Sequence, residues 1–309
     1  MKNISRREAT KLIACSSIAA FAIPSMLNAF NTGSKMLKRK IPSTGQPLSV
    51  IGLGTWQSFD IGNNSNDRER LSNVLLTMKK HGGQMIDSSP MYGNSEKVVG
   101  DLTTKLEIQK DFFYATKVWT TGKQSGIAQM KSSLKTMNRK KMDLMQIHNI
   151  VDWKTHVKTL KNWKEKEIIK YWGITHYTNS SHDQLSKIIK TEKPDFVQFN
   201  YSIDNRHAEH ELISTAVSNN TAIIINRPYN GGSLFKKIKN KPLPKWAKEY
   251  NINSWGQFFL KYILSNKAIN CVIPGTSKPH HALDNMMAGY GVLPDDTVRK
   301  KMYNHFKKL

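Results

Sequence analysis

The sequence predicts one (β/α)8 barrel, an α/β fold in which a closed parallel sheet is surrounded by helices. Short apolar runs alternate with helical stretches that have polar faces, and eight such alternations follow one another without a break in composition. The length of 309 residues is normal for one such barrel. A hydrophobic fraction of 39% with 23% charged residues is typical of a soluble globular protein, not of a disordered or multi-span chain.

The elements are expected in the following order. A β-hairpin pairs residues 38–41 with 48–51 across a turn at 43–45, and the first barrel strand follows at 51–56. The other strands are expected at residues 85–86, 113–118, 144–148, 172–175, 196–200, 222–226 and 271–273. Helices are expected at residues 68–81, 96–102, 130–137, 153–166, 182–190, 208–217, 255–264 and 282–287.

Two of the predicted connections bear on the binding of a ligand. The loop at residues 229–245 is long and rich in glycine, lysine and proline, which makes it a candidate lid. The loop at residues 149–152 is short, which indicates an open site.

Residues 1–29 have the three parts of an export signal: a basic start, an apolar run and a small residue at Ala29. The pair Arg6 and Arg7 resembles a twin-arginine signal, although Ala-Thr replaces the usual Phe-Leu after the pair. The apolar run is interrupted and shorter than the ~20 residues that a spanning helix needs. We therefore predict export to the periplasm, or otherwise out of the cytoplasm, by the twin-arginine machinery, without stable membrane insertion.

Removal of residues 1–29 would leave a linker at 30–37 and a barrel domain at 38–309. The only cysteine remaining would be Cys271, so the mature chain could form no internal disulfide. This is consistent with a protein that folds before it is exported.

The formal net charge of +24 comes mostly from lysine. A basic surface of this kind can attract nucleic acid or an anionic membrane. We favour a well-solvated lysine-rich surface instead, because no recognition motif with interleaved aromatic residues is present. We expect no nucleic-acid partner. The histidines show no ligand spacing that predicts a metal site.

A strand-to-helix loop carries Asp87 and Tyr92, and the helix is expected to begin at Asn94 or Ser95. A tyrosine can donate a proton to a carbonyl group only if its reference pKa of about 10 is lowered. A nearby ammonium would lower it by stabilising the phenolate, and a carboxylate would hold that ammonium in place. Taken alone, however, an aspartate such as Asp87 commonly caps a turn, and a tyrosine such as Tyr92 is commonly an ordinary aromatic residue of a loop.

Two further polar residues lie on the next two strands. Lys117 interrupts an apolar run, where its charge is costly unless it meets an anion or has a function. His148 ends the following strand, and barrel enzymes build their sites at this end of the strands. A lone histidine on an apolar strand is otherwise more often a hydrogen-bonded core residue.

Together these residues form a series that resembles the aldo-keto reductase family over residues 36–285: Asp87, Tyr92, Lys117 and His148. The resemblance implies a (β/α)8 TIM barrel with an N-terminal β-hairpin that reduces an aldehyde or ketone to an alcohol. Tyr92 would protonate the carbonyl oxygen with help from Lys117 and Asp87, and His148 would orient that oxygen. A cofactor-binding regulatory or redox-sensor protein with little turnover, as some family members are, is the alternative.

The hydride must come from a bound nicotinamide, because no side chain donates one. In this chain Thr175 and His176 replace the Ser-Asn pair of the family, and Asn226 stands where an aromatic ring usually stacks on the nicotinamide. By resemblance, the residues expected to bind the cofactor are Thr175, His176, Gln198, Asn226, Arg227, Pro228, Gly275, Thr276, Ser277, Lys278, His281 and Asn285.

The phosphate end of the cofactor is expected at residues 272–285. The Thr276 hydroxyl, backbone N–H groups and the following helix N-terminus would hold a phosphate oxygen. Relatives that use NADP generally place arginine where this chain has His281. Because Lys278 or Arg227 could supply the positive charge, we favour NADP, with NAD as the alternative.

Overall fold

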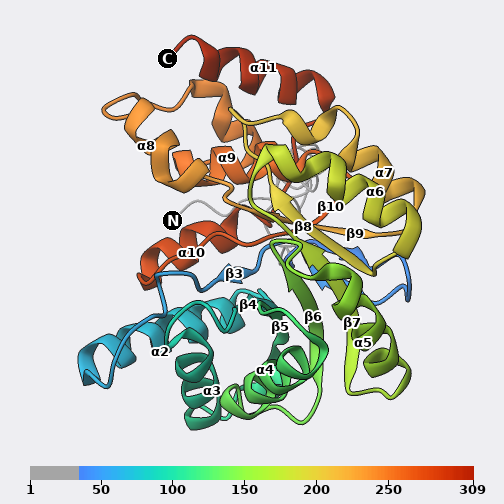
Figure 1. Ribbon diagram of the computed structural model, residues 1–309. Coiled ribbons are helices and arrows are strands. Elements are labelled where there is room, and N and C mark those ends of the chain that lie inside the picture. Colours follow the sequence, from blue (N-terminus) through green and yellow to red (C-terminus); the bar gives the residue numbers. More distant parts are fainter. Residues whose placement is uncertain (1–34) are drawn as a thin grey trace, which may run out of the picture. The chain divides into compact units, whose positions relative to one another are not determined.

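Eight parallel strands lie side by side in the order of the chain (Figure 1). The computed structural model describes residues 35–309, so the predicted export signal lies outside the described residues. Bridges from Ile51 to Val272 and from Gly54 to Gly275 join the first strand to the last and close the barrel, which confirms the predicted fold. The strands are β3 (Leu53–Gly54), β4 (Met85–Asp87), β5 (Phe113–Val118), β6 (Met142–His148), β7 (Ile169–Thr175), β8 (Phe196–Asn200), β9 (Ala222–Asn226) and β10 (Ile269–Val272).

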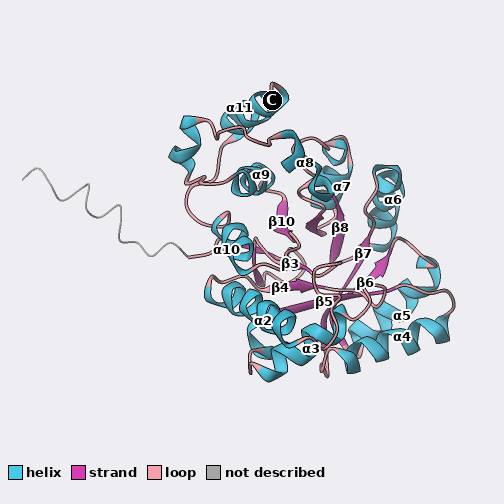
Figure 2. Cartoon of the chain, turned by 90° about the vertical axis from the view of Figure 1, so that its left-hand side faces the viewer, coloured by secondary structure: helices cyan, strands magenta, loops and turns pink. Residues whose placement is uncertain are grey.

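Helices surround these strands on the outside (Figure 2). The helices are α2 (Ser65–Lys80), α3 (Ser95–Lys105), α4 (Lys123–Thr136), α5 (Trp153–Glu165), α6 (His182–Glu192), α7 (Leu212–Ser218), α8 (Ser233–Lys237), α9 (Trp255–Leu264), α10 (Pro279–Met287) and α11 (Asp296–Lys307). None of the helices between residues 35 and 309 has both the length and the apolar character that are needed to cross a bilayer.

The largest differences from the predicted elements are in three helices. Helix α4 begins seven residues earlier than expected. Helix α8 lies in the predicted loop at 229–245, so this candidate lid is partly helical. Helix α11 was not predicted, although Asp295 caps it by accepting a hydrogen bond from the Val298 N–H at 2.8 Å. The short loop at 149–152 is confirmed, because β6 ends at His148 and α5 begins at Trp153.

The interior of the barrel changes from apolar to polar along the strands. Successive strand residues point to opposite faces of the sheet, so Phe113, Ala115 and Lys117 on β5 all point inward. The apolar inward residues form one buried cluster, which is separate from the larger cluster between strands and helices. The inward residues nearest the carboxyl ends are polar, which places a polar layer above an apolar one.

The predicted hairpin is confirmed and closes the amino end of the barrel. Strands β1 (Lys38–Lys40) and β2 (Pro47–Ser49) pair antiparallel. Ile41 and Leu48 join the inner apolar cluster. The Tyr171 hydroxyl on β7 donates to Gln46 at 2.8 Å, which ties the hairpin to the barrel.

We predict that Arg39 stabilises this closure. Its guanidinium donates hydrogen bonds to the carbonyl groups of Asn266 at 2.9 Å, Leu264 at 2.5 Å and Ile269. Arg39→Met should lower the free energy of unfolding by about 2–3 kcal/mol, because these carbonyl groups lose a charged donor. Urea denaturation measures the change, and Lys38→Met, at an exposed neighbour, is the control. Equal effects of the two substitutions would contradict the prediction.

Candidate active site

A buried ion pair lies in the polar layer of the barrel. Lys117 on β5 has no exposed surface, and its Nζ donates to Asp87 Oδ2 at 2.7 Å and to the Ser88 carbonyl at 2.6 Å. Burial alone would lower the pKa of Lys117, but the Asp87 carboxylate and Tyr92 outweigh it, and the pKa lies above its ordinary value. Lys117 therefore stays an ammonium group.

Tyr92 packs directly against this ammonium. The Lys117 Nζ lies 4.8 Å from the centre of the Tyr92 ring. Burial is the largest influence on Tyr92 and raises the pKa of its phenol, while the Lys117 charge lowers it and the Asp87 charge raises it again. The expectation of a phenol more acidic than usual is therefore wrong: the Lys117 charge that lowers the pKa is present, but burial is the stronger effect. The phenol is protonated, as a proton donor must be.

His148 completes the group. Its ring meets the Tyr92 ring edge-on, with centroids 5.7 Å apart, and its Nδ1 lies 3.0 Å from the Ser89 hydroxyl. Burial, followed by the charges of Lys117 and His176, lowers the pKa of His148 to about 2. The imidazole is neutral at any working pH. The structure thus brings all four predicted catalytic residues together at the carboxyl end of the barrel.

Two amide side chains hold the remaining oxygen of Asp87. Its Oδ1 accepts from Gln146 Nε2 at 2.9 Å and from Gln198 Nε2 at 3.0 Å. Gln198 Oε1 in turn accepts from the Thr175 hydroxyl at 3.2 Å. Gln198, predicted to hold the cofactor, therefore uses its amide inside the protein. The role of Gln146 was not predicted, because in the sequence it is only one polar residue within an apolar strand.

His176 and Asn226 lie next to this network, at the ends of β7 and β9. His176 Nδ1 accepts from the backbone N–H groups of Tyr177 at 3.0 Å and Thr178 at 3.2 Å, so the ring proton resides on Nε2. Burial lowers the pKa of His176 and favours this neutral form. Asn226 Nδ2 donates to the His176 carbonyl at 3.2 Å and to Gln198 at 3.3 Å.

The other end of the Asn226 amide has no partner. Its Oδ1 is buried and accepts no hydrogen bond within the described residues, 35–309. A buried acceptor without a donor is unfavourable by roughly 1–3 kcal/mol. The end of β9 therefore holds one buried, unsatisfied oxygen, on Asn226, beside His176, whose ring proton is on Nε2.

The predicted phosphate loop leads into α10. The Thr276 hydroxyl accepts from the Lys278 N–H at 3.1 Å, and the helix begins at Pro279. The Arg70 side chain on α2 reaches this loop, and its Nε donates to the Ser277 carbonyl at 3.2 Å. Arg70 was missed because it precedes Ser277 by 207 residues.

The other predicted cofactor residues divide between two places. Arg227 has a left-handed backbone (φ 50°), and its guanidinium lies 5.7 Å from the Tyr177 ring centre, beside β7 and not in the phosphate loop. Asn285 Oδ1 accepts from the Tyr229 hydroxyl at 2.6 Å, which leaves the amide N–H₂ of Asn285 as a donor. His281 packs on His280, with ring centroids 4.3 Å apart. Pro228 follows β9, and Gly275 pairs with Gly54 where the barrel closes.

Exposed aromatic side chains surround the carboxyl ends of the strands. Trp56 follows β3 and is 53% exposed, and Trp119 follows β5 and is 42% exposed. The Trp119 ring centre lies 6.4 Å from that of His148. Trp119 therefore offers apolar surface beside His148. No set of three or more His, Cys, Asp or Glu residues in the described chain is arranged to hold a metal ion.

The model of the Aldo/keto reductase family matches residues 50–301, most of the chain. The chain is similar to methylglyoxal reductase YeaE of Escherichia coli, with 23% identity over 246 residues, 77% of this chain and 84% of the relative. It is 26% identical over 258 residues to the NADH-specific methylglyoxal reductase of E. coli, 73% of this chain and 78% of the relative. An aldo/keto reductase from Klebsiella pneumoniae, solved with NADP and acetate, has a TM-score of 0.70 at 19% identity, over 85% of this chain and 93% of that one, and shares the fold.

We predict that His148 makes the protein sensitive to acid. In the unfolded chain His148 has a pKa near 6.5 and binds a proton below that pH. In the folded protein its pKa is about 2, so the imidazole stays neutral down to about pH 2. The free energy of unfolding should therefore fall as the pH drops below about 6.5. In His148→Gln the dependence of this free energy on pH, measured by urea denaturation between about pH 4 and 5.5, should be shallower by about 1.4 kcal/mol per pH unit. The prediction would be contradicted if His148→Gln changed the free energy of unfolding by the same amount at every pH and left its slope against pH unchanged.

Proposed function

The chain belongs to the aldo/keto reductase family, and we propose that it reduces an aldehyde or ketone to an alcohol with NAD(P)H. The observation that carries this proposal is the buried Lys117 ammonium, held between Asp87 and the Tyr92 ring. A buried ion pair is weak as a source of stability. It is well suited to stabilise a phenolate that forms in a water-poor site.

In this proposal Tyr92 donates its phenolic proton to the carbonyl oxygen of the substrate. Bound reduced nicotinamide supplies the hydride for the carbonyl carbon. Burial raises the pKa of Tyr92 and opposes proton donation, while the Lys117 charge lowers it and stabilises the phenolate that remains after transfer. Asp87 holds Lys117 in position. His148 is neutral, and with Nδ1 hydrogen-bonded to Ser89 its Nε2 can orient the carbonyl oxygen.

The residues present fit a nicotinamide carboxamide. The His176 Nε2–H would donate to the carboxamide oxygen, and the unsatisfied Asn226 Oδ1 would accept from the carboxamide N–H₂. Hydrogen bonds to the carboxamide at one edge of the nicotinamide ring would thus replace the stacking aromatic residue, whose position is taken by Asn226 in this chain.

We favour NADP as the cofactor, with NAD as the alternative. The K. pneumoniae structure contains NADP, whereas one E. coli relative is NADH-specific. In this chain Lys278 belongs to the phosphate loop and Arg70 lies against it. Two cations beside the loop would favour the additional phosphate of NADP.

The substrate is proposed to be a small carbonyl compound, and methylglyoxal is the first to test, because two relatives are methylglyoxal reductases. Because the loop at 149–152 is short, we expect the site to be open on one side. We also propose that the protein acts outside the cytoplasm after twin-arginine export, on the evidence of residues 1–29 alone.

We predict that Tyr92→Phe nearly abolishes turnover. The variant keeps the ring against Lys117 but loses the proton donor, so kcat should fall by at least about 10²–10⁴-fold. The NADPH dissociation constant, measured by fluorescence, should stay within about twofold of the wild-type value. Tyr250→Phe, outside the site, is the matched control. Turnover retained in Tyr92→Phe would refute the assignment, and a single stoichiometric burst from the wild type would favour the sensor alternative.

We predict that Asn226 distinguishes NADP⁺ from its 3-acetylpyridine analogue, which has a methyl group in place of the amide nitrogen. The analogue cannot donate to Asn226 Oδ1, so the wild type should bind it about 3–10-fold more weakly, the loss of about one hydrogen bond. In Asn226→Ala this difference should disappear. Isothermal titration calorimetry measures both ligands, with Asn162→Ala on the α5 surface as the control. A difference that persists in Asn226→Ala would exclude the contact.

A further inference from the structure

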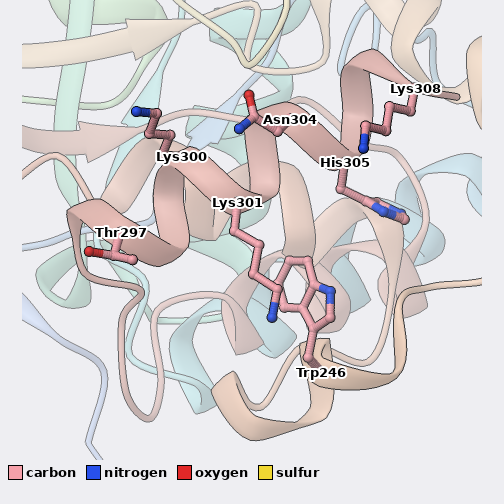
Figure 3. A pocket seen from close by; sticks show the side chains of 7 residues that line it. All are labelled: Trp246, Thr297, Lys300, Lys301, Asn304, His305 and Lys308. Atoms are coloured by element: carbon pink, nitrogen blue, oxygen red, sulfur yellow. The ribbon is translucent and has the colours of Figure 1, made fainter.

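A hollow of about 400 Å³ opens between α11 and η6 (Lys245–Tyr250) (Figure 3). Its volume lies within the range of small-molecule sites. None of its residues belongs to the candidate active site. The hollow is lined by Trp246, Thr297, Lys300, Lys301, Asn304, His305 and Lys308.

The sequence of α11 explains why polar side chains meet here. Thr297, Lys301 and Lys308 recur at helical spacing and share one face of the helix. On another face Met302 and Phe306 are buried in the core. Burial of this apolar face turns the lysine face outward, toward Trp246.

The floor of the hollow is aromatic. The Trp246 ring centre lies 6.0 Å from Phe258 and 6.1 Å from His305, and His305 stacks on Trp255 with an interplanar angle of 12°. The Lys301 Nζ lies 4.4 Å from the centre of the Trp246 ring. Burial and the Lys308 charge lower the pKa of His305, so the positive charge of the hollow comes from its lysines.

The lysines of the hollow lack salt-bridge partners among residues 35–309. In the part of the chain that the structure describes, Lys300, Lys301 and Lys308 form no salt bridge. The segments 236–248 and 299–308 contain ten lysines and one arginine; Glu249 follows the first segment, and Asp295 and Asp296 precede the second. Unpaired ammonium groups on one helix face repel one another, and a bound anion would relieve this repulsion.

We propose that this hollow binds a small phosphate-bearing anion. Lysine is a compact charge suited to phosphate, and Thr297 and Asn304 add groups that can hydrogen-bond to it. These side chains border a hollow (Figure 3), whereas a polymer or a membrane would need an extended track or a flat face. The proposal does not depend on the reductase activity, because the hollow shares no residue with that site.

Calorimetric titration with inorganic pyrophosphate at low ionic strength tests the proposal. The full chain is first saturated with NADP⁺, which would occupy the predicted phosphate loop before α10. Wild type should bind one pyrophosphate, and Lys300→Gln/Lys301→Gln/Lys308→Gln should bind it at least tenfold more weakly. The control, Lys131→Gln/Lys135→Gln/Lys158→Gln, removes the same charge from exposed sites on α4 and α5 and should bind normally.

Two further measurements make the test specific. Pyrophosphate should change the tryptophan fluorescence of the wild type, and Trp246→Phe should lose this change while calorimetric binding remains. The proposal is overturned if wild type binds no pyrophosphate or if both triple variants lose binding equally, which would indicate diffuse net charge. It is also overturned if the protein binds only heparin or phosphatidylglycerol vesicles.

Discussion

The candidate active site depends on one interaction, the ion pair between Lys117 and Asp87 inside the barrel. Two charges taken out of water are stable only when every polar atom around them is satisfied. Here Lys117 also donates to the Ser88 carbonyl, and the side-chain amides of Gln146 and Gln198 donate hydrogen bonds to the other carboxylate oxygen of Asp87. The pair places a fixed positive charge against Tyr92, and the proton transfer that we propose is built on this charge.

The barrel makes this arrangement possible through the alternation of its strands. Inward positions near the amino end are apolar and are closed by the hairpin residues Ile41 and Leu48. The same inward positions nearer the carboxyl end carry polar side chains, which is why Lys117 can lie directly above Ala115. The apolar layer keeps water away from the ion pair from below.

Local patterns in the sequence were sufficient to predict the strands and most of the helices of the barrel. The strands at 113–118, 196–200 and 222–226 were placed at their observed bounds, because each is a short, mostly apolar run. A lysine inside such a run indicated a buried anion partner. Helix α11 was missed although its capping aspartate was visible, since its surface face is almost entirely lysine and polar.

Other features depend on contacts between distant segments. The hydrogen bonds of Gln146 to Asp87 and of Arg70 to Ser277 join residues 59 and 207 positions apart, so no local signal revealed them. The effect of charge on Tyr92 was predictable from residue types, but the larger effect of burial was not. The tautomer of His176 likewise follows only from the backbone groups that surround its ring.

The most direct test of this account removes the charge and its partner together. Asp87→Asn/Lys117→Met leaves no unpaired ion in the barrel, so the fold should be retained. Measured by NADPH oxidation, kcat/KM for methylglyoxal should fall by at least about 10²-fold, while the NADPH dissociation constant stays near the wild-type value. A variant that is folded and binds NADPH, yet reduces methylglyoxal within about threefold of the wild-type rate, would contradict the account.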